Sequence, residues 1–140
     1  MRPRIILRML PVTHDPVLSR FPPESFIQSL HLGPPKAPLG FARWHSASSM
    51  QGVAQILDFL IDPPHRRQGH GRALMQHLIT QCAKYGKLRQ TPLRRLWIAV
   101  AQKDHIHARA FLISQGFHHV VSLGNLLREQ DALVYMRTFD

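Results

Sequence analysis

The chain has 140 residues, of which 44% are hydrophobic, and its 18 Lys and Arg against 8 Asp and Glu give a formal net charge of +10. This length suits one domain over residues 1–140 with its own core, and the apolar fraction is that of a globular protein rather than a disordered one. The charge favours polyanionic partners, namely nucleic acid, an anionic membrane surface or a phosphate-rich cofactor. A single cysteine excludes an intrachain disulfide and no window is long and apolar enough to span a bilayer, so we expect a cytoplasmic protein that does not bind membranes.

The beginning of the chain is rich in proline. Ile5–Leu10 predicts a strand that Pro11 stops, and any helix that follows must be short and lie near Pro16–Arg20. Ser25–Leu32 fits either one face of a helix or one side of a strand. Because a Gly-Pro turn cluster separates it from the strand-like Leu39–His45, a hairpin is favoured.

The centre of the chain predicts a strand, a turn and a helix. Val53–Ile61 is a strand that ends at a double proline. Arg72–Tyr85 carries apolar residues along one side of a helix, and Gly86 is placed to end it. Cys82 falls within this apolar stripe, which predicts a buried and unreactive thiol. Lys87–Arg95 then forms a basic connection.

The last part of the chain alternates strands with one more helix. Leu96–Val100 is an uninterrupted apolar run, typical of a strand covered on both faces. Ile106–Gln115 predicts a second helix with Gly116 just beyond its end. Strands over Val120–Leu123 and Ala132–Phe139 close the chain. After the first strand, the predicted order is β-β-β-α-β-α-β-β.

The turn between the central strand and its helix has the composition of an anion site. Gly69 and Gly71 let backbone N–H groups approach an anion closely because neither residue has a Cβ. The first turn of the helix adds unpaired N–H donors and the positive end of its dipole. The ordinary phosphate-binding loop G-x-x-x-x-G-K-[ST] is excluded, and Leu74 stands where G-x-G-x-x-G requires a third glycine. A pyrophosphate is the obvious anion.

Together with Arg66, this turn reads R-x-x-G-x-G after an apolar strand, and it resembles the acyl-CoA-binding signature of the GNAT N-acetyltransferase superfamily. A second segment, residues 104–117, resembles the family's N-x-x-A-x-x-F-Y-x-x-x-G-F. The matching residues there are Ala108, Phe111, Gly116 and Phe117. The resemblance implies an α/β (α+β) GNAT fold, with a central mixed sheet that is splayed at the cofactor strand and flanked by helices.

The resemblance also implies an activity. Members of the superfamily are acyltransferases (EC 2.3.1 class) that transfer an acetyl group from acetyl-CoA to an amine by direct attack on the thioester. The acceptor here, a small molecule or a protein amine, is not identified. In the family the loop amides wrap the pyrophosphate of coenzyme A, and the preceding strand pairs with its pantetheine arm. The cofactor-binding residues that this implies are Phe59, Leu60, Ile61, Arg66, Arg67, Gln68, Gly69, His70, Gly71, Arg72, Ala73, Ala108 and Phe111.

The chain departs from the family pattern at the proton donor. His105 stands where the family often has Asn, and Leu112 stands where it often has the Tyr that protonates the departing thiolate. Leucine cannot donate a proton, so this route is absent or another residue supplies it. Tyr85 and Tyr135 are the two tyrosines of the chain, and the sequence places neither at the sulfur.

The general base is also open. The usual acidic position on the glycine-loop strand falls near Gln55, which cannot accept a proton. Asp58 on the same strand is a catalytic candidate, although an exposed strand face explains it equally well. His105 and His107 are further candidates, and water could also serve, because positioning alone supplies much of the rate in several members of the family.

Three alternatives complete the expectations. Histidines spaced like ligand pairs suggest a metal, but a lone cysteine and the lack of clustered acidic residues argue against one, so no metal is expected. A non-catalytic acyl-CoA-binding module is the main alternative function, and a nucleic-acid-binding protein is less favoured because no binding motif accompanies the charge. The proline-rich start favours an open acceptor side, suited to a bulky acceptor or completed by a second subunit in a homodimer.

Overall fold

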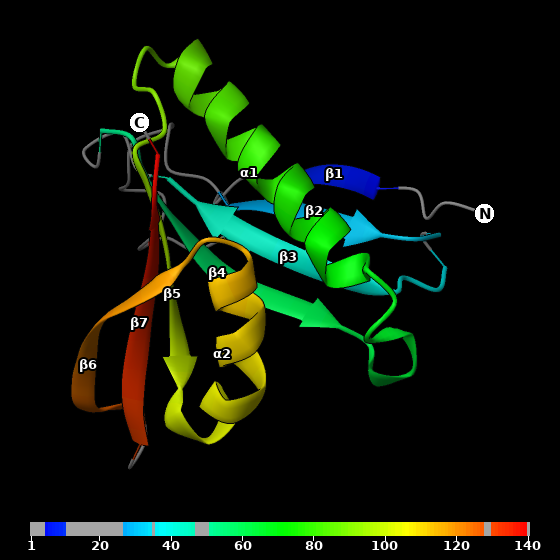
Figure 1. Ribbon diagram of the computed structural model, residues 1–140. Coiled ribbons are helices and arrows are strands. Elements are labelled where there is room, and N and C mark those ends of the chain that lie inside the picture. The colour runs from blue at the N-terminus through cyan, green and yellow to red at the C-terminus, as the bar shows by residue number, and fades with distance from the viewer. Residues whose placement is uncertain (1–4, 11–26, 35, 47–50, 128–129, 140) are drawn as a thin grey trace, which may run out of the picture.

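The computed structural model describes residues 5–10, 27–34, 36–46, 51–127 and 130–139. Its centre is a seven-stranded sheet in the order β1-β2-β3-β4-β5-β7-β6, and two helices accompany it (Figure 1). The elements are β1 (Ile5–Leu10), β2 (Ile27–Leu32), β3 (Gly40–His45), β4 (Val53–Ile61), η3 (Pro63–His65), α1 (His70–Leu88), β5 (Arg95–Ala101), η4 (Gln102–Asp104), α2 (His105–Ser114), β6 (His118–Leu127) and β7 (Gln130–Thr138).

The sheet is mixed, as expected. Strands β1 to β4 run antiparallel to one another in sequence order, which confirms the hairpin between β2 and β3. β4 and β5 are parallel, and α1 is the crossover that such a pair requires. β7 then pairs antiparallel with both β5 and β6 at the far end of the sheet. The GNAT-like order of elements is therefore confirmed.

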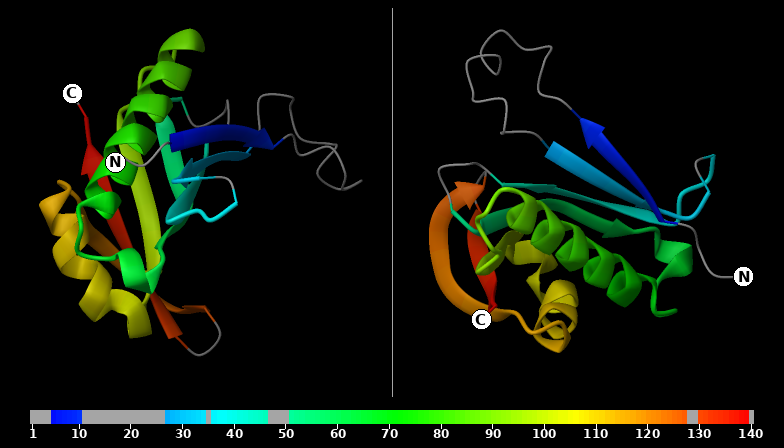
Figure 2. Two further views of the ribbon diagram at one scale, coloured as in Figure 1. Left: turned by 90° about the vertical axis from the view of Figure 1, so that its right-hand side faces the viewer. Right: turned by 90° about the horizontal axis from the view of Figure 1, so that it is seen from above.

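The core lies between α1 and strands β2 to β4. One side of α1 is buried against the sheet, and its members are Leu74, Met75, Leu78 and Cys82. The strands contribute Leu30, Trp44 and Ile56, each at most 1% exposed. Figure 2 shows both helices on the same side of the sheet, α1 over β2 to β4 and α2 near β5. Cys82 is inert, as predicted, because burial raises the pKa of its thiol.

The end of α1 corrects one prediction. The helix runs through Gly86 and ends at Leu88, so Gly86 does not terminate it. A Cβ at Gly86 would stand 2.5 Å from the carbonyl oxygen of Thr91. The glycine is there because the connection after the helix folds back against it, and a rule based on neighbouring residues cannot detect this contact.

The strands differ from the predictions in extent. β6 begins at His118 and continues to Leu127, so the expected strand over Val120–Leu123 was too short. Its pairing with β7 is irregular, with shifts in register between His119 and Val121 and between Leu123 and Leu127. The middle residues of β5 are only half-buried, so cover on both of its faces is incomplete. The short helix expected near Pro16–Arg20 lies outside the described residues.

Within the described ranges, none of the helices combines the length and apolar character needed to cross a membrane.

Candidate active site

The site is organised around a gap between two parallel strands. β4 and β5 pair over Val53–Ile56 and Arg95–Ile98, and both strands are described throughout their length. Beyond this point β4 continues to Ile61 and β5 to Ala101 without pairing with each other, so the strands separate (Figure 1). The backbone groups of β4 on this side are left for another partner, as at the edge of a sheet. The expected splay is confirmed.

A β-bulge coincides with the start of the gap. Arg43 of β3 pairs with Asp58, whereas the next residue, Trp44, pairs with Ile56. Leu57 is therefore an extra residue on β4, and such a bulge bends and twists the strand that carries it. The bend falls where β4 leaves β5.

The turn after β4 presents its backbone to open space. Gly69 is the N-cap of α1, with φ of 81°, in the left-handed region that favours glycine. An added Cβ at Gly69 would meet nothing within 4 Å. The glycine is thus required by its conformation rather than by close packing, and it directly precedes the first N–H groups of α1, which have no partner within the helix.

Gly71 lies where α1, α2 and β4 meet. A Cβ at Gly71 would stand 3.2 Å from the ring of Phe111 on α2. That ring in turn lies 5.5 Å, between centroids, from the ring of Phe59 on β4. The structure therefore brings together three residues that the sequence assigned to the cofactor from two separate segments. Ala108, one turn before Phe111, is half-buried on the same helix.

The polar side chains of the turn lie in different environments. The Nε of Arg66 donates a hydrogen bond to the carbonyl oxygen of Ile61 at 2.9 Å, and the amide of Gln68 donates to Pro64 at 3.3 Å. These two side chains hold the turn in shape, while Arg67 is exposed. The remaining assigned residues of this region lie at the end of β4 or in the first turn of α1, and they are Leu60, His70, Arg72 and Ala73.

A cavity of about 670 Å³ lies between α1 and the end of α2. Arg72 lines it on the side of the turn, and Arg137 of β7 lines it on the other. Arg137 is held by a 2.9 Å hydrogen bond from its Nη1 to the carbonyl oxygen of Gln115. The lining residues that the sequence did not assign to the cofactor are Gln76, Ile79, Thr80, Ser114, Gln115, Gly116 and Arg137. Of these, Gly116 belongs to the second motif, and no local motif marks the others, because they meet only in the folded chain.

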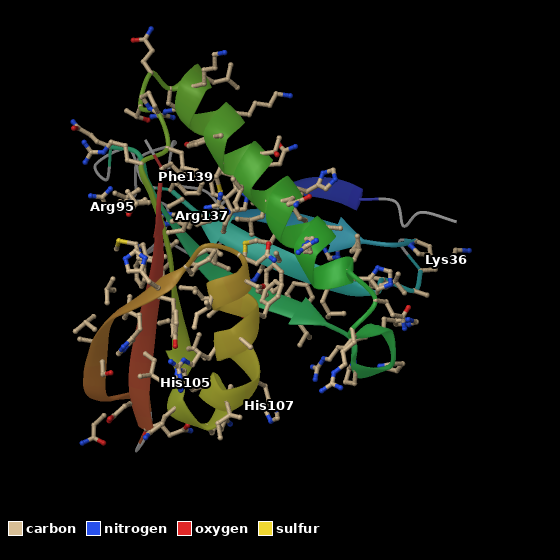
Figure 3. The ribbon with its side chains drawn as sticks, viewed as in Figure 1. Lys36, Arg95, His105, His107, Arg137 and Phe139 are labelled. Atoms are coloured by element: carbon tan, nitrogen blue, oxygen red, sulfur yellow. The ribbon has the colours of Figure 1, made fainter. Side chains whose placement is uncertain are left out.

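The three candidates for proton transfer have different surroundings. Asp58 is about 40% exposed and forms an ion pair with Arg43 on the neighbouring strand. His105 begins α2, and its Nε2 lies 2.5 Å from the hydroxyl of Tyr135, which is 1% exposed. In Figure 3 the side chain of His107 points outward, so the two histidines face different ways. Leu112, at the usual tyrosine position, is 3% exposed and belongs to the core.

Among the residues that the structure describes, no three His, Cys, Asp or Glu side chains gather in a way that could hold a metal ion.

Comparison with known families decides the assignment. Residues 11–117 match the model of the family described as the acetyltransferase (GNAT) family. The chain belongs to the GNAT acetyltransferase family. It is accordingly a GNAT N-acetyltransferase, an acyltransferase of the EC 2.3.1 class, whose acceptor is unidentified. Members of this family typically use acetyl-CoA.

Solved structures agree with the fold of this GNAT protein. A protein from Desulfovibrio desulfuricans assigned to the GNAT family superimposes with a TM-score of 0.71 at 17% identity, over 96% of this chain and 99% of that one. The ribosomal-protein-S18-alanine N-acetyltransferase of Escherichia coli gives a TM-score of 0.67 at 21% identity, over 96% and 94% of the two chains. The PaiA N-acetyltransferase of Thermoplasma acidophilum, solved with coenzyme A, gives 0.61 at 13% identity, over 81% and 61%. Comparison with curated proteins finds no match.

Proposed function

We propose that this GNAT enzyme binds acetyl-CoA across the open side of β4 and the N-terminus of α1, and that it transfers the acetyl group to a primary amine. One observation carries this proposal. The pairing of β4 with β5 stops at Ile56 and Ile98, yet β4 continues for another five residues, Leu57–Ile61, straight into the glycine turn. An open strand edge that leads to a helix N-terminus suits a ligand with an extended, amide-containing arm and a phosphate end.

The residues present fit such a ligand. The space beside Gly69 is open, and the first N–H groups of α1, which follow this residue, can donate to a pyrophosphate. The exposed side chains of Arg67 and Arg72 add positive charge beside it. The amides of a pantetheine arm can exchange hydrogen bonds with the unpaired backbone of β4, and the cavity next to Arg72 provides room for more of the cofactor.

The reaction requires little proton transfer from the protein's side chains. Acetyl-CoA supplies an acyl group already activated as a thioester. The acceptor nitrogen must be neutral, and its lone pair forms the new C–N bond as the C–S bond breaks; the nitrogen then loses a proton and the thiolate gains one. The enzyme supplies most of the rate by holding the amine against the thioester. Asp58 is placed to hold the amine and pass its proton to solvent, and His105 with Tyr135 is the second pair that can exchange a proton.

Thermal unfolding with and without acetyl-CoA tests the cofactor, with ATP and NAD as phosphate-bearing controls. A ligand that binds only the folded state stabilises it by about 2.7 kcal/mol at a hundred times its Kd. We expect a large shift in Tm with acetyl-CoA alone. Equal shifts with all three ligands, or none with any, would reject the assigned cofactor site.

A further inference from the structure

A second hollow lies on the opposite face of the sheet from α1. It has a volume of about 390 Å³ and is lined by Ser29, His31, Phe41, Arg43 and Asp58. Residues that alternate with these along β2 and β3, such as Leu30, Ala42 and Trp44, are buried in the core beneath α1. Because successive side chains of a strand point to opposite faces, the hollow opens on the far side of the sheet. We call it the β2–β4 groove.

We propose that the β2–β4 groove is the acceptor site, and that its acceptor is the N-terminal amine of a peptide with an apolar or aromatic first side chain. This inference rests on the proposed acetyl transfer. Its first support is position. Asp58 lines the groove and also belongs to Leu57–Ile61, the stretch of β4 that borders the cofactor gap. An amine held at Asp58 therefore lies next to the strand segment along which the thioester would bind.

The ion pair in the groove matches the polar groups of a peptide N-terminus. Arg43 directs both Nε and Nη2 to Oδ2 of Asp58. Nη1 of Arg43 and Oδ1 of Asp58 are left outside this ion pair. The N–H groups of an amine can donate to the carboxylate oxygen, while the carbonyl group attached to the same α-carbon accepts from the guanidinium. A lysine side chain or a polyamine has no carbonyl near its nitrogen. It could therefore bind Asp58 but not Arg43.

The rest of the groove suits an apolar side chain. The rings of His31 and Phe41 are stacked, with their centroids 6.1 Å apart and an angle of 27° between their planes. Such a pair presents apolar ring surface to an aromatic or branched aliphatic group. A peptide whose first residue is Phe or Leu would place that group there while its backbone meets Arg43 and Asp58.

The lack of an unpaired base in the groove also favours a peptide α-amine as the acceptor. Gln55 and Leu112, at the usual base and acid positions, cannot transfer protons, and Asp58 is already paired with a cation. A peptide α-amine has a pKa of about 7.7–8.0, whereas that of a lysine side chain is about 10.4. At pH 7.5 roughly a third of the former is neutral and only roughly a thousandth of the latter. An enzyme whose base in this groove is already ion-paired is suited to the amine that is already neutral.

The test measures release of free thiol from acetyl-CoA with four acceptors: the peptide Phe-Ala-Ala, free phenylalanine, phenethylamine and spermidine. Phenethylamine keeps the ring and the amine but lacks the carbonyl. We expect kcat/KM to be highest for the peptide. The variant Arg43→Gln should lower kcat/KM for the peptide by roughly tenfold to a hundredfold and leave phenethylamine almost unchanged, because the peptide has a carbonyl group that binds the guanidinium and phenethylamine has none. Arg94→Gln, an exposed arginine elsewhere, is the matched control.

The variant Asp58→Asn tests the group that holds the amine. It should slow transfer to every amine, while the rise in Tm caused by acetyl-CoA stays the same. An unchanged rise in Tm also shows that the variant folds. A clear preference for spermidine or phenethylamine, or an equal effect of Arg43→Gln on all four acceptors, would overturn the acceptor assignment and leave the acetyl-transfer proposal standing. A preference for free phenylalanine would overturn the peptide in favour of an amino acid. If acetyl-CoA does not raise Tm, the proposed function itself fails.

Discussion

Gly86 shows how one residue inside a helix can be fixed by the chain that follows it. Replacing a glycine within a helix by alanine ordinarily stabilises a protein by about 1 kcal/mol. Here the new Cβ would stand 2.5 Å from the backbone oxygen of Thr91 and 3.1 Å from the backbone nitrogen of Leu93. We therefore expect Gly86→Ala to lower Tm, measured by circular dichroism. Lys84→Ala on the exposed side of the same helix is the control and should change Tm little; stabilisation by Gly86→Ala would contradict the close packing.

His45 gives the protein a dependence on pH. Burial lowers the pKa of its imidazole below the ordinary value of 6.5. Above pH 6.5 the ring is neutral in both the folded and the unfolded chain. Below it the unfolded chain takes up the proton first, so the free energy of unfolding falls as the pH falls.

We expect His45→Gln to lose less stability than the wild type between about pH 6.5 and 5 in urea unfolding. His107→Gln, at an exposed position, serves as the control. Identical pH profiles for the wild type and His45→Gln would show that this imidazole is not the group responsible.

At the scale of elements, local pattern was sufficient for most of the fold. The apolar runs predicted β3, β4 and β5 nearly to the residue, and the glycine turn placed α1 behind β4. The bulge at Leu57 could not be predicted, because it depends on how β4 registers with Arg43 and Trp44 of another strand. The contact between His105 and Tyr135 could not be predicted either, because the two residues are 30 positions apart in sequence.

The junction of β4, α1 and α2 can be tested at Gly71. Valine there would push against the ring of Phe111, which a Cβ alone already approaches to 3.2 Å. Displacing the first turn of α1 should raise KM for acetyl-CoA by about tenfold to a hundredfold, because small misplacements at such sites have effects of that size. Gly124→Ala is the control, since an added Cβ there meets only a side-chain oxygen at 3.8 Å. An unchanged KM in Gly71→Val would argue against cofactor binding at this turn.

The link between α2 and β7 can be tested at Tyr135. Tyr135→Phe removes the hydroxyl that contacts His105 and should lower the free energy of unfolding by about 1 kcal/mol. If this pair exchanges the proton, kcat falls and its pH profile shifts, whereas the rise in Tm caused by acetyl-CoA does not change. Tyr85→Phe, which alters the other tyrosine, is the control. Lower stability with an unchanged kcat would give the pair a purely structural role.

For the whole molecule, the net charge of +10 exceeds what one cofactor requires. A field of this sign attracts acetyl-CoA over a distance that salt shortens, from about 10 Å at 0.1 M to about 3 Å at 1 M ionic strength. We expect KM for acetyl-CoA to rise several-fold between about 0.05 and 0.5 M KCl, with a smaller change in kcat. Sucrose at equal osmolality is the control. A constant KM would mean that the short-range backbone donors of the turn dominate binding.

The short pairing between β4 and β5 also bears on how the molecule moves. Four residue pairs form the whole strand-to-strand seam between a four-stranded half of the sheet, β1 to β4, and a three-stranded half, β5 to β7. Because β4 and β5 share fewer residue pairs than either strand shares with its other neighbour, we expect the sheet to open more easily here than at those two pairings. A pantetheine arm lying in the gap would extend the seam along Leu57–Ile61 and act as a temporary strand. Release of coenzyme A would then undo that added strand, so each turnover would include one cycle in which the two half-sheets are joined and parted.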